Sequence, residues 1–387
     1  MTVYYQVTAD NYTTVTGSAT VTISKASVGK SSVTMSDYLY GRTVSTPSVS
    51  SNPGNGTVTY YYNTTDSTTG GTEWKDIGST TLAANTYYMY AKIAETANYN
   101  AYTTGTTSFT VASATEVTTA VELKEALDRK DSYVLVTAEI AAEDDFTVDA
   151  ATTLILEDKL SVYSMPMTVN GRVEIHEGGE LYIGAEETLE NNGIITNDGT
   201  LGVAPLGALY NAGTINNNST LNIEYDDGYG ETGVFINGSS DSTKAGTVKN
   251  AGTITIDGKF INPGGGTVTN LSGGTITGEI RQQGSVTSGV TNANDSYYLA
   301  AFDANGGYWE DGDVLWLVVY AKKDASGYAE VSAPTSAPEA GASVEGKICV
   351  RWSYKDENGD DRTLNSGGST AQIKQDTVFQ AYWDFAI

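Results

Sequence analysis

The sequence of 387 residues has very few of the side chains on which most catalytic and metal sites depend. It contains one histidine, His176, and one cysteine, Cys349. A single cysteine cannot form an internal disulfide. A single histidine excludes histidine-rich metal sites and leaves little scope for general-base chemistry. We therefore predict a chain that folds without a disulfide framework and has no metal ligand set built on histidine.

Positive charge and long apolar runs are also scarce. The chain has 21 Lys and Arg against 47 Asp and Glu, for a net charge of −26. Such a surface repels phosphate backbones and anionic lipids, so we predict no nucleic-acid partner. The longest apolar run, residues 314–320, is far shorter than the roughly 20 residues of a membrane span, so we predict no membrane insertion. The first residues lack the pattern of a secretory signal peptide, and we expect any signal or anchor to lie outside this sequence.

The abundant residues indicate strands. The chain has 42 glycines and 26 tyrosines but 7 phenylalanines, and aromatic residues make up 10% of it. Aromatic and β-branched residues favour strands, whereas acidic disordered chains are poor in both. We predict an all-β protein of two to four domains, at roughly 100–200 residues per domain.

A segment near the start of the chain recurs later. The pair Asn11-Tyr12 returns as Asn98-Tyr99, and a glycine followed by a β-strand pattern comes shortly after each pair. The offset of roughly 90 residues suits one small β-sandwich. We predict that the chain starts with the last part of one repeat and continues with a complete one.

This region resembles the Ig-like repeats of bacterial surface proteins. The resemblance rests on Lys25-Ala26, Tyr40-Gly41 and the strand pattern of residues 57–60. It implies that residues 1–25 are the C-terminal part of a truncated Ig-like repeat and residues 26–113 an Ig-like β-sandwich.

We make one prediction for the tyrosine runs of this region and a separate one for its lysines. Alternate strand residues point to opposite faces, so about half of the tyrosines should pack in the core or its rim. The alternative is an exposed aromatic platform for sugar or protein. A side hypothesis is a covalent Lys–Asn cross-link in an apolar core. The tyrosines are Tyr60, Tyr61, Tyr62, Tyr87, Tyr88 and Tyr90, and the lysines are Lys25, Lys30, Lys75 and Lys92.

One clear helix is predicted, over residues 119–130. Thr119 and Glu122 have the spacing of a capping box, and Leu123 and Leu127 follow at helical spacing. A lone amphipathic helix before an array of strands is suited to cover the exposed end of that array.

A period of about 20 residues follows the helix. The motif Asn-x-Gly-x-Ile, or a close variant, recurs along the chain, and such a constant step is typical of a β-solenoid. We predict a right-handed solenoid of about eight rungs over residues 114–293. Glycine should supply positive φ at the corners, and asparagines should stack into a ladder. The recurring positions are Asn191, Asn211, Glu231, Asn250 and Asn270.

The helix followed by the strand at residues 133–136 resembles the start of a pectate-lyase-type β-helix. This resemblance implies a possible polysaccharide lyase or hydrolase. The hydrolase motifs are missing, because His176 is not flanked by glycines and no Arg-x-Lys occurs. Asp226 and Asp227 could act as an acid and base pair but lie in a predicted loop. We predict no catalytic residue.

Residues 294–387 resemble the Listeria–Bacteroides repeat, also called the internalin B-repeat. The opening Phe302-Asp303, the turn Asn305-Gly306-Gly307 and the closing motif from Asp376 to Trp383 carry the resemblance. The middle departs from the pattern, because Arg351 rather than glycine precedes Trp352. The resemblance implies a small β-grasp-like module of a kind that occurs in tandem on bacterial surfaces, where some members contact host receptors.

Several side chains of this last region are expected to be structural. Trp352 and Trp383 should be core aromatics, and Cys349 should be a buried strand residue. Asp356, Asn358 and Asp360 have the spacing of a calcium loop, but Asp361 and Gly367 stand where such a loop needs glycine and glutamate. We predict an Asn-Gly hairpin at this point.

The order of modules favours a non-catalytic segment of a bacterial surface adhesin or stalk protein. We expect it at the cell surface or in the cell wall, with no cofactor and no metal. Its expected partners are a host surface protein or a glycan, and neighbouring repeats of the same polypeptide. One alternative is a carbohydrate-active solenoid that binds glycan or cleaves acidic polysaccharide; another is a purely structural spacer. The sequence does not predict which residues bind the ligand.

Overall fold

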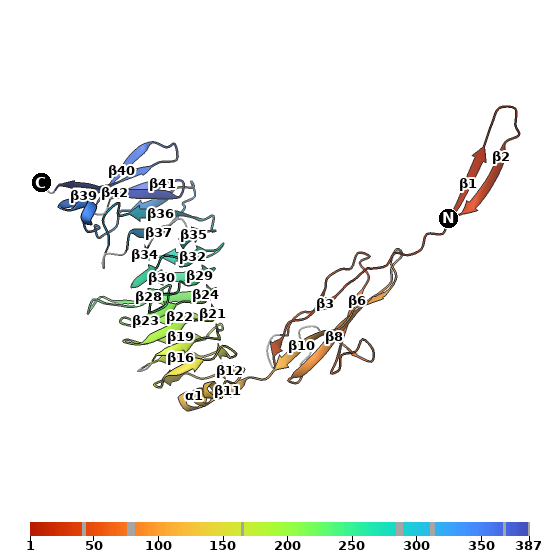
Figure 1. Cartoon of the computed structure of the whole chain (residues 1–387), viewed down its shortest axis with the longest axis horizontal. Coiled ribbons are helices and arrows are strands. Elements are labelled where there is room, and N and C mark those ends of the chain that lie inside the picture. Colours follow the sequence, from red (N-terminus) through yellow and green to blue (C-terminus); the bar gives the residue numbers. More distant parts are fainter. Residues whose placement is uncertain are drawn as a thin grey trace. The chain divides into compact units, whose positions relative to one another are not determined.

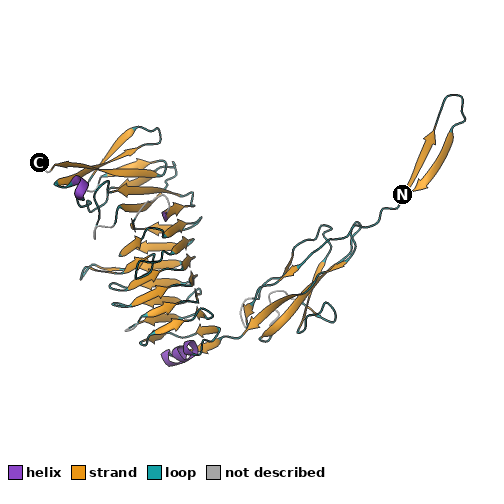
Figure 2. Ribbon diagram, viewed as in Figure 1, coloured by secondary structure: helices purple, strands orange, loops and turns teal. Residues whose placement is uncertain are grey.

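The computed structural model describes residues 1–40, 44–75, 82–163, 166–283, 289–309, 314–366 and 369–385. Strands dominate throughout, which confirms the all-β prediction (Figure 2). The chain divides into two compact units, Met1–Ala114 and Thr115–Ile387. In the described part of the chain, no helix is long and apolar enough to cross a membrane.

The first unit contains an N-terminal hairpin and two further sheets. The hairpin strands β1 (Thr2–Val7) and β2 (Val15–Thr20) pair with each other, and almost all of their residues are exposed. A six-stranded sheet has the order β4-β10-β8-β6-β7, with β9 paired to β8. Its strands are β4 (Tyr38–Leu39), β6 (Val58–Asn63), β7 (Thr72–Glu73), β8 (Asn85–Ile93), β9 (Tyr102–Thr103) and β10 (Thr107–Ala112). The two-stranded sheet consists of β3 (Val33–Thr34) and β5 (Ser48–Val49).

Aromatic packing forms the core of this unit. Phe109 stacks against Tyr87 with ring centroids 5.6 Å apart, and Trp74 lies 5.9 Å from Phe109. Tyr90 is also buried, on the other face of β8, where its ring stacks on Tyr61 at 5.2 Å. The packing role predicted for the tyrosines is therefore confirmed at these positions. Gly41 of the Tyr-Gly motif lies outside the described residues.

The lysine cross-link hypothesis is wrong for this unit. Such a bond needs a lysine in an apolar core, and all four lysines are exposed. Lys25 forms an ion pair with Glu95 at 3.3 Å, and Lys92 lies over the ring of Tyr61 at 4.7 Å. These charged side chains stay at the surface because burying them without a partner is costly.

The second unit begins with helix α1 (Ala120–Asp128), which is shorter at both ends than predicted. The capping box is present: the Thr119 hydroxyl accepts the Glu122 amide, and the Glu122 carboxylate accepts the Thr119 amide. Leu123, Ala126 and Leu127 are buried in the same apolar cluster as the strands that follow. The helix therefore covers the first rungs of the strand array (Figure 1).

The array is a β-solenoid of about eight turns, built from three parallel sheets (Figure 1). Sheet 1 contains β11 (Thr115–Val117), β12 (Tyr133–Val136), β15 (Thr153–Leu156), β18 (Arg172–Ile175), β21 (Ile194–Asn197), β24 (Thr214–Asn217), β29 (Thr247–Asn250), β32 (Thr267–Asn270) and β35 (Val290–Asn292). Sheet 2 contains β13 (Ile140–Ala142), β16 (Lys159–Val162), β19 (Glu180–Ile183), β22 (Thr200–Val203), β25 (Thr220–Ile223), β30 (Thr253–Ile256) and β33 (Thr275–Thr277). Sheet 3 starts with β14 (Phe146–Val148), β17 (Met167–Val169), β20 (Thr188–Asn191), β23 (Ala208–Asn211), β28 (Val234–Ile236), β31 (Lys259–Asn262) and β34 (Ile280–Gln282).

Each short strand points an apolar side chain inward, and equivalent residues stack from rung to rung. Ile195 pairs with Ile215, and Ile215 with Val248, all with no exposed surface. The alternate residues of the same strands face outward, as the two-residue period of a strand requires. This columnar core confirms the solenoid predicted from the 20-residue period.

Two buried asparagine ladders run along two corners of the solenoid, where one was predicted. In each, the side-chain amide of one rung donates to the side-chain oxygen of the next at 2.6–2.9 Å. The first ladder contains Asn191, Asn211, Asn237, Asn262 and Gln282. The second ladder contains Asn197, Asn217, Asn250 and Asn270.

The predicted register was therefore wrong after Asn211. The 20-residue spacing predicts that Asn211, Glu231 and Asn250 occupy equivalent positions in successive rungs. In the structure, Asn211 bonds to Asn237, and Asn250 belongs to the second ladder. Two excursions in one turn cause the difference. The hairpin of β26 (Tyr225–Asp226) and β27 (Glu231–Thr232) precedes β28, and a loop over residues 238–246 follows it.

Glycines at some solenoid turns, such as Gly178 and Gly273, have positive φ as predicted, but the predicted reason was wrong for the glycines of the recurring Asn-x-Gly motif. Gly193 and Gly213 do not have positive φ. A Cβ on Gly193 would collide with the carbonyl oxygen of Gly171, and one on Gly213 with that of Gly193. These glycines are required because successive rungs approach each other closely at the corner, not because of backbone handedness.

The C-terminal region continues sheet 3. Strand β34 pairs antiparallel with β37 (Trp316–Lys322), and the sheet proceeds through β36 (Tyr297–Asp303), β42 (Thr377–Phe385), β39 (Lys347–Lys355) and β40 (Asp361–Asn365). A separate pair is formed by β38 (Ala329–Ser332) and β41 (Thr370–Ile373), and a 3₁₀ helix spans Ala342–Val344. We call residues 294–387 the C-terminal module.

The two faces of the module's large sheet are both buried in part. One face carries Phe302, Phe379 and Trp352, which form the module's own core. The other face contributes Val318 and Tyr320 to the apolar core of the solenoid. The module therefore covers the last rung of the solenoid, as α1 covers the first (Figure 1).

Candidate functional site

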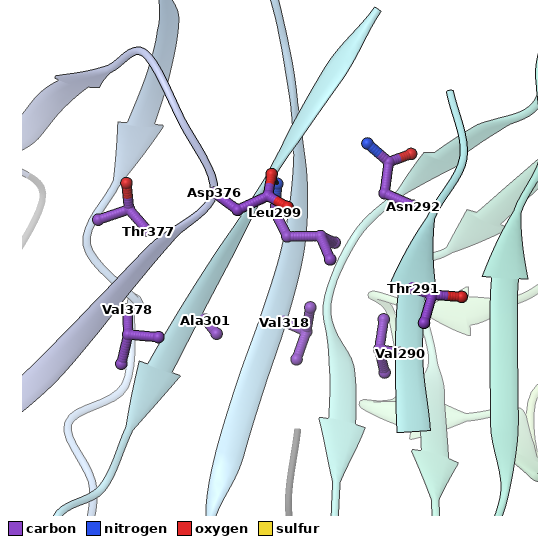
Figure 3. Close-up of a pocket in the computed structure, with 9 residues that line it drawn as sticks. All are labelled: Val290, Thr291, Asn292, Leu299, Ala301, Val318, Asp376, Thr377 and Val378. Carbon is purple, nitrogen blue, oxygen red and sulfur yellow. Dashed lines mark hydrogen bonds between the residues drawn. The ribbon is translucent and has the colours of Figure 1, made fainter. Parts of the chain in front are cut away.

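A hollow lies where the last solenoid strand meets the C-terminal module (Figure 3). We call it the junction hollow; its volume is about 390 Å³, within the range of roughly 300–1,000 Å³ usual for ligand pockets. It is lined by Val290, Thr291, Asn292, Leu299, Ala301, Val318, Asp376, Thr377 and Val378.

Three module strands and one solenoid strand position these side chains. Val290, Thr291 and Asn292 are the whole of β35, while the apolar floor comes from neighbouring strands β36, β37 and β42. Ala301 pairs with Val318 on one side and with Val378 on the other. The floor is thus a continuous patch across three strands of one sheet.

Tyr320 fixes the wall of the junction hollow. Its buried hydroxyl donates to the backbone oxygen of Thr291 at 3.0 Å and so ties β37 to β35. Burial raises the pKa of Tyr320, and the nearby Asp376 carboxylate raises it further. The hydroxyl therefore stays protonated and remains a donor at physiological pH.

Asp376 is the one ionisable residue among those that line the junction hollow. Its Oδ1 accepts the backbone amide of Leu299 at 2.8 Å, and its side chain is exposed. Two further hollows, of about 350 and 490 Å³, also include Asp376 in their linings. A ligand with an apolar body and a positively charged or hydrogen-bond-donating group would match this arrangement.

The single histidine lies away from the junction hollow, on the outer side of sheet 1. His176 Nδ1 is 3.6 Å from Glu157 Oε1, and Nε2 is 3.8 Å from Glu174 Oε2. The neighbouring Glu174 carboxylate raises the pKa of His176; burial opposes this shift, and the charge of Glu157 adds to it. The histidine is thus held between two carboxylates, which is the arrangement of an ion-pair cluster.

We expect His176 to titrate with a midpoint above 6.5 in a proton NMR titration, where it is the sole histidine signal. Because its pKa is raised in the folded state, its contribution to stability is complete below pH 6.5 and is lost as the pH rises through the folded pKa. Glu174→Gln should move the midpoint down towards 6.5. Glu177→Gln, an exposed neighbour, should leave it unchanged, and a wild-type midpoint at or below 6.5 would contradict the arrangement.

Two tyrosines lie flat on the outer side of sheet 2 and its edge. A Cβ on Gly184 would meet the ring of Tyr163, and one on Gly202 would meet the ring of Tyr182. The Tyr182 hydroxyl donates to Glu224 at 3.2 Å, and burial together with that carboxylate raises its pKa to about 12. Aromatic rings and carboxylates therefore meet on this face.

Lys159 covers part of this aromatic surface. Its Nζ lies 4.7 Å from the centre of the Tyr182 ring and bonds to Glu180 at 3.0 Å. Tyr163 is more accessible, with 40% of its surface exposed. Of the two rings, Tyr163 is the one open to a ligand.

The other residues singled out from the sequence have structural contacts. The segment predicted as a loop is a short hairpin: Asp226 ends β26 and its Oδ1 accepts the Gly228 amide, and Asp227 lies in the turn. Trp352 and Cys349 are buried as predicted, whereas Trp383 is partly buried and its indole donates to the Ala304 oxygen at 3.0 Å.

The acidic loop of the module forms the predicted hairpin between β39 and β40. Asp356 Oδ1 accepts the amides of Asn358 and Asp360, and Oδ2 bonds to Arg362 at 2.8 Å. Its carboxylate is thus engaged in closing the turn. Gly367, the last position compared with a calcium loop, lies outside the described residues, among which no three His, Cys, Asp or Glu side chains form a metal-binding group.

Sequence analysis did not identify the junction hollow. Asp376 is the first residue of the closing motif and directly precedes β42. Its neighbours in the hollow, such as Val290 and Leu299, are apolar strand residues of an ordinary kind. No local motif distinguishes them, because the hollow is created by segments that are distant in the sequence.

A comparison with protein-family models finds no matching family. Comparisons with curated proteins and with solved structures find no significant similarity either.

Proposed function

We propose that the chain is a non-catalytic segment of a bacterial surface adhesin or stalk protein that displays β modules for attachment. The observation that carries this proposal is the closed solenoid of Thr115–Ile387, whose apolar core is covered by α1 at one end and by the C-terminal module at the other. At the module end, the pairing of β34 with β37 leaves the solenoid strands of sheet 3 without an open edge, and the covered core exposes less apolar surface. A rigid solenoid of this kind keeps the residues on its outer faces and the C-terminal module in fixed positions, where a partner can bind them.

The family resemblances support the same proposal. The hairpin β1–β2 has the sequence pattern of part of the region that follows it, as expected for Ig-like repeats in tandem. The turn at Asn305-Gly306, where both residues have positive φ, and the buried Trp352 fit a Listeria–Bacteroides-type module with a β-grasp-like fold. We propose these assignments, with a right-handed course for the solenoid and a location at the bacterial cell surface or wall.

The location is tested on cells that express the complete protein. Antibodies raised against the C-terminal module should label intact cells, and protease added outside should remove the epitope while a cytosolic control protein survives. Recovery of the protein in the cytosolic fraction, protected from external protease, would contradict the proposal.

A second candidate function is carbohydrate binding or cleavage by the solenoid, favoured by the Tyr163 and Tyr182 rings beside Glu224. Tyrosine offers an apolar face with a polar tip, which suits a sugar ring. A glycan array combined with a lyase and hydrolase screen on acidic polysaccharides decides this candidate, and no signal in either would eliminate it. The remaining alternative, a purely structural spacer, predicts no binding to glycans, host cells or matrix proteins.

A further inference from the structure

We propose that the junction hollow binds an extended peptide segment in which a lysine or arginine stands between small apolar or β-branched residues. The proposal deepens the display function and rests on it, because it names the class of partner that the module end of the rod would hold. The site is built from a strand edge, an apolar floor and an unpaired carboxylate.

The strand edge is that of β35. Among the described strands, β35 is the last of sheet 1 and pairs with β32 alone. Its three residues form one wall of the junction hollow (Figure 3). An open edge offers backbone donors and acceptors to an added strand, which is how many extended peptides are bound. A peptide here would continue the parallel ladder of the solenoid by one rung.

The floor suits the side chains of such a strand. Leu299 and Val378 present apolar atoms to the hollow, and the buried side chains of Ala301 and Val318 lie beneath them. Every second residue of an extended peptide points to the same side, so two or three small apolar side chains would face this floor. The volume of about 390 Å³ admits a short segment of this kind.

The charge of the site selects a basic residue. Among the described residues, no lysine or arginine forms an ion pair with Asp376, whose Oδ1 accepts the Leu299 amide. One neighbouring hollow contains Lys323 and Lys374, which lie over the rings of Tyr298 and Tyr328 at 3.9 and 4.9 Å. The other contains Lys355, which pairs with Asp361 at 2.6 Å. With a net charge of −26 on the chain, a basic peptide would also be attracted at long range.

The test uses the purified full chain and a fluorescein-labelled heptapeptide of alternating valine and threonine with a central lysine. Fluorescence anisotropy should show saturable binding. Asp376→Asn keeps an acceptor for the Leu299 amide and removes the charge, so it should weaken binding about tenfold, the effect of losing a charge-assisted contact. Asp384 is an exposed aspartate of β42, the strand that follows Asp376, and it lies outside the three hollows, so Asp384→Asn should leave binding unchanged.

Two further measurements decide the site and the ligand class. Replacing the central lysine of the peptide by glutamate should weaken binding at least tenfold, and hydrogen exchange should slow in residues 290–293 when the lysine peptide is bound. No saturable binding, equal effects of the two aspartate variants, equal binding of the glutamate peptide, or protection confined to other segments would each overturn the proposal. These results are independent of the cellular location, so a failure here leaves the surface experiment to judge the display function separately.

Discussion

Replacing Asn217 by alanine should lower the free energy of unfolding of the solenoid by about 3–5 kcal/mol. Asn217 accepts the amide of Asn197 at 2.7 Å and donates to Asn250 at 2.8 Å and to the Thr253 oxygen at 3.0 Å. Asn197 and Asn250 are fully buried, so water cannot replace the hydrogen bonds lost between these side chains. The measurement is the shift of the urea midpoint followed by circular dichroism.

Asn218 is the matched control for this substitution. It is the next residue in the chain and is exposed, and its side chain donates to Asp198 at 2.9 Å at the surface. Asn218→Ala should change the stability by at most about 0.5 kcal/mol. Similar losses for the two variants would contradict the structural role of the second ladder.

Gly193→Ala should destabilise the solenoid by about 3 kcal/mol or more, since the added Cβ would collide with the backbone of the preceding rung. The obstacle is the carbonyl oxygen of Gly171, which cannot move without disturbing the ladder between sheet 1 strands. Thermal unfolding followed by calorimetry would report the loss as a lower transition temperature.

Gly264→Ala is the control for the glycine prediction. Gly264 belongs to the same solenoid, its φ is not positive, and the nearest atom to an added Cβ is 3.8 Å away. Its substitution should leave the transition temperature almost unchanged. A stable Gly193→Ala variant would mean that the rungs do not approach at this corner as described.

The sequence was sufficient to predict the solenoid and to associate its asparagines with ladders, because stacked rungs impose a constant period. It was insufficient to assign each asparagine to its corner. The β26–β27 hairpin before β28 and the loop after it lengthen one turn of the solenoid. Gly233 and Asn250 nevertheless lie in the sequence close to the positions that a 20-residue period predicts. Backbone pairing decides the true register, and it places Asn250 beside Asn217.

The start of each ladder also depends on the rung before it. In the preceding rung, Val169 pairs with Asn191 and Ile175 pairs with Asn197. Neither asparagine therefore has a side-chain amide at the equivalent position of the preceding rung. The Asn197 side-chain oxygen is left buried without a partner among the described residues. Such an end could not be located from the sequence, because apolar and asparagine side chains occupy equivalent strand positions.

The candidate site was less accessible to sequence reasoning than the fold. The side chains of the junction hollow come from residues 290–301, Val318 and residues 376–378, which have no common motif. They meet because β34 pairs with β37 and carries the module's sheet over the last rung. In the first unit, the tyrosine pattern predicted burial but not that Tyr87 and Tyr90 pack on opposite faces of β8.

The central claim of this account is the register of the solenoid, because the ladders, the corner glycines and the junction hollow all depend on it. Thr214→Cys with Thr247→Cys, in a Cys349→Ala background, places two thiols on adjacent outer positions of β24 and β29, at a strand spacing of about 4.8 Å. A short thiol cross-linker should join them rapidly within one chain, as mass spectrometry of the digested protein would show. Thr214→Cys with Val234→Cys, the pair that an uninterrupted 20-residue register would bring together, should not cross-link; the opposite result would contradict the account.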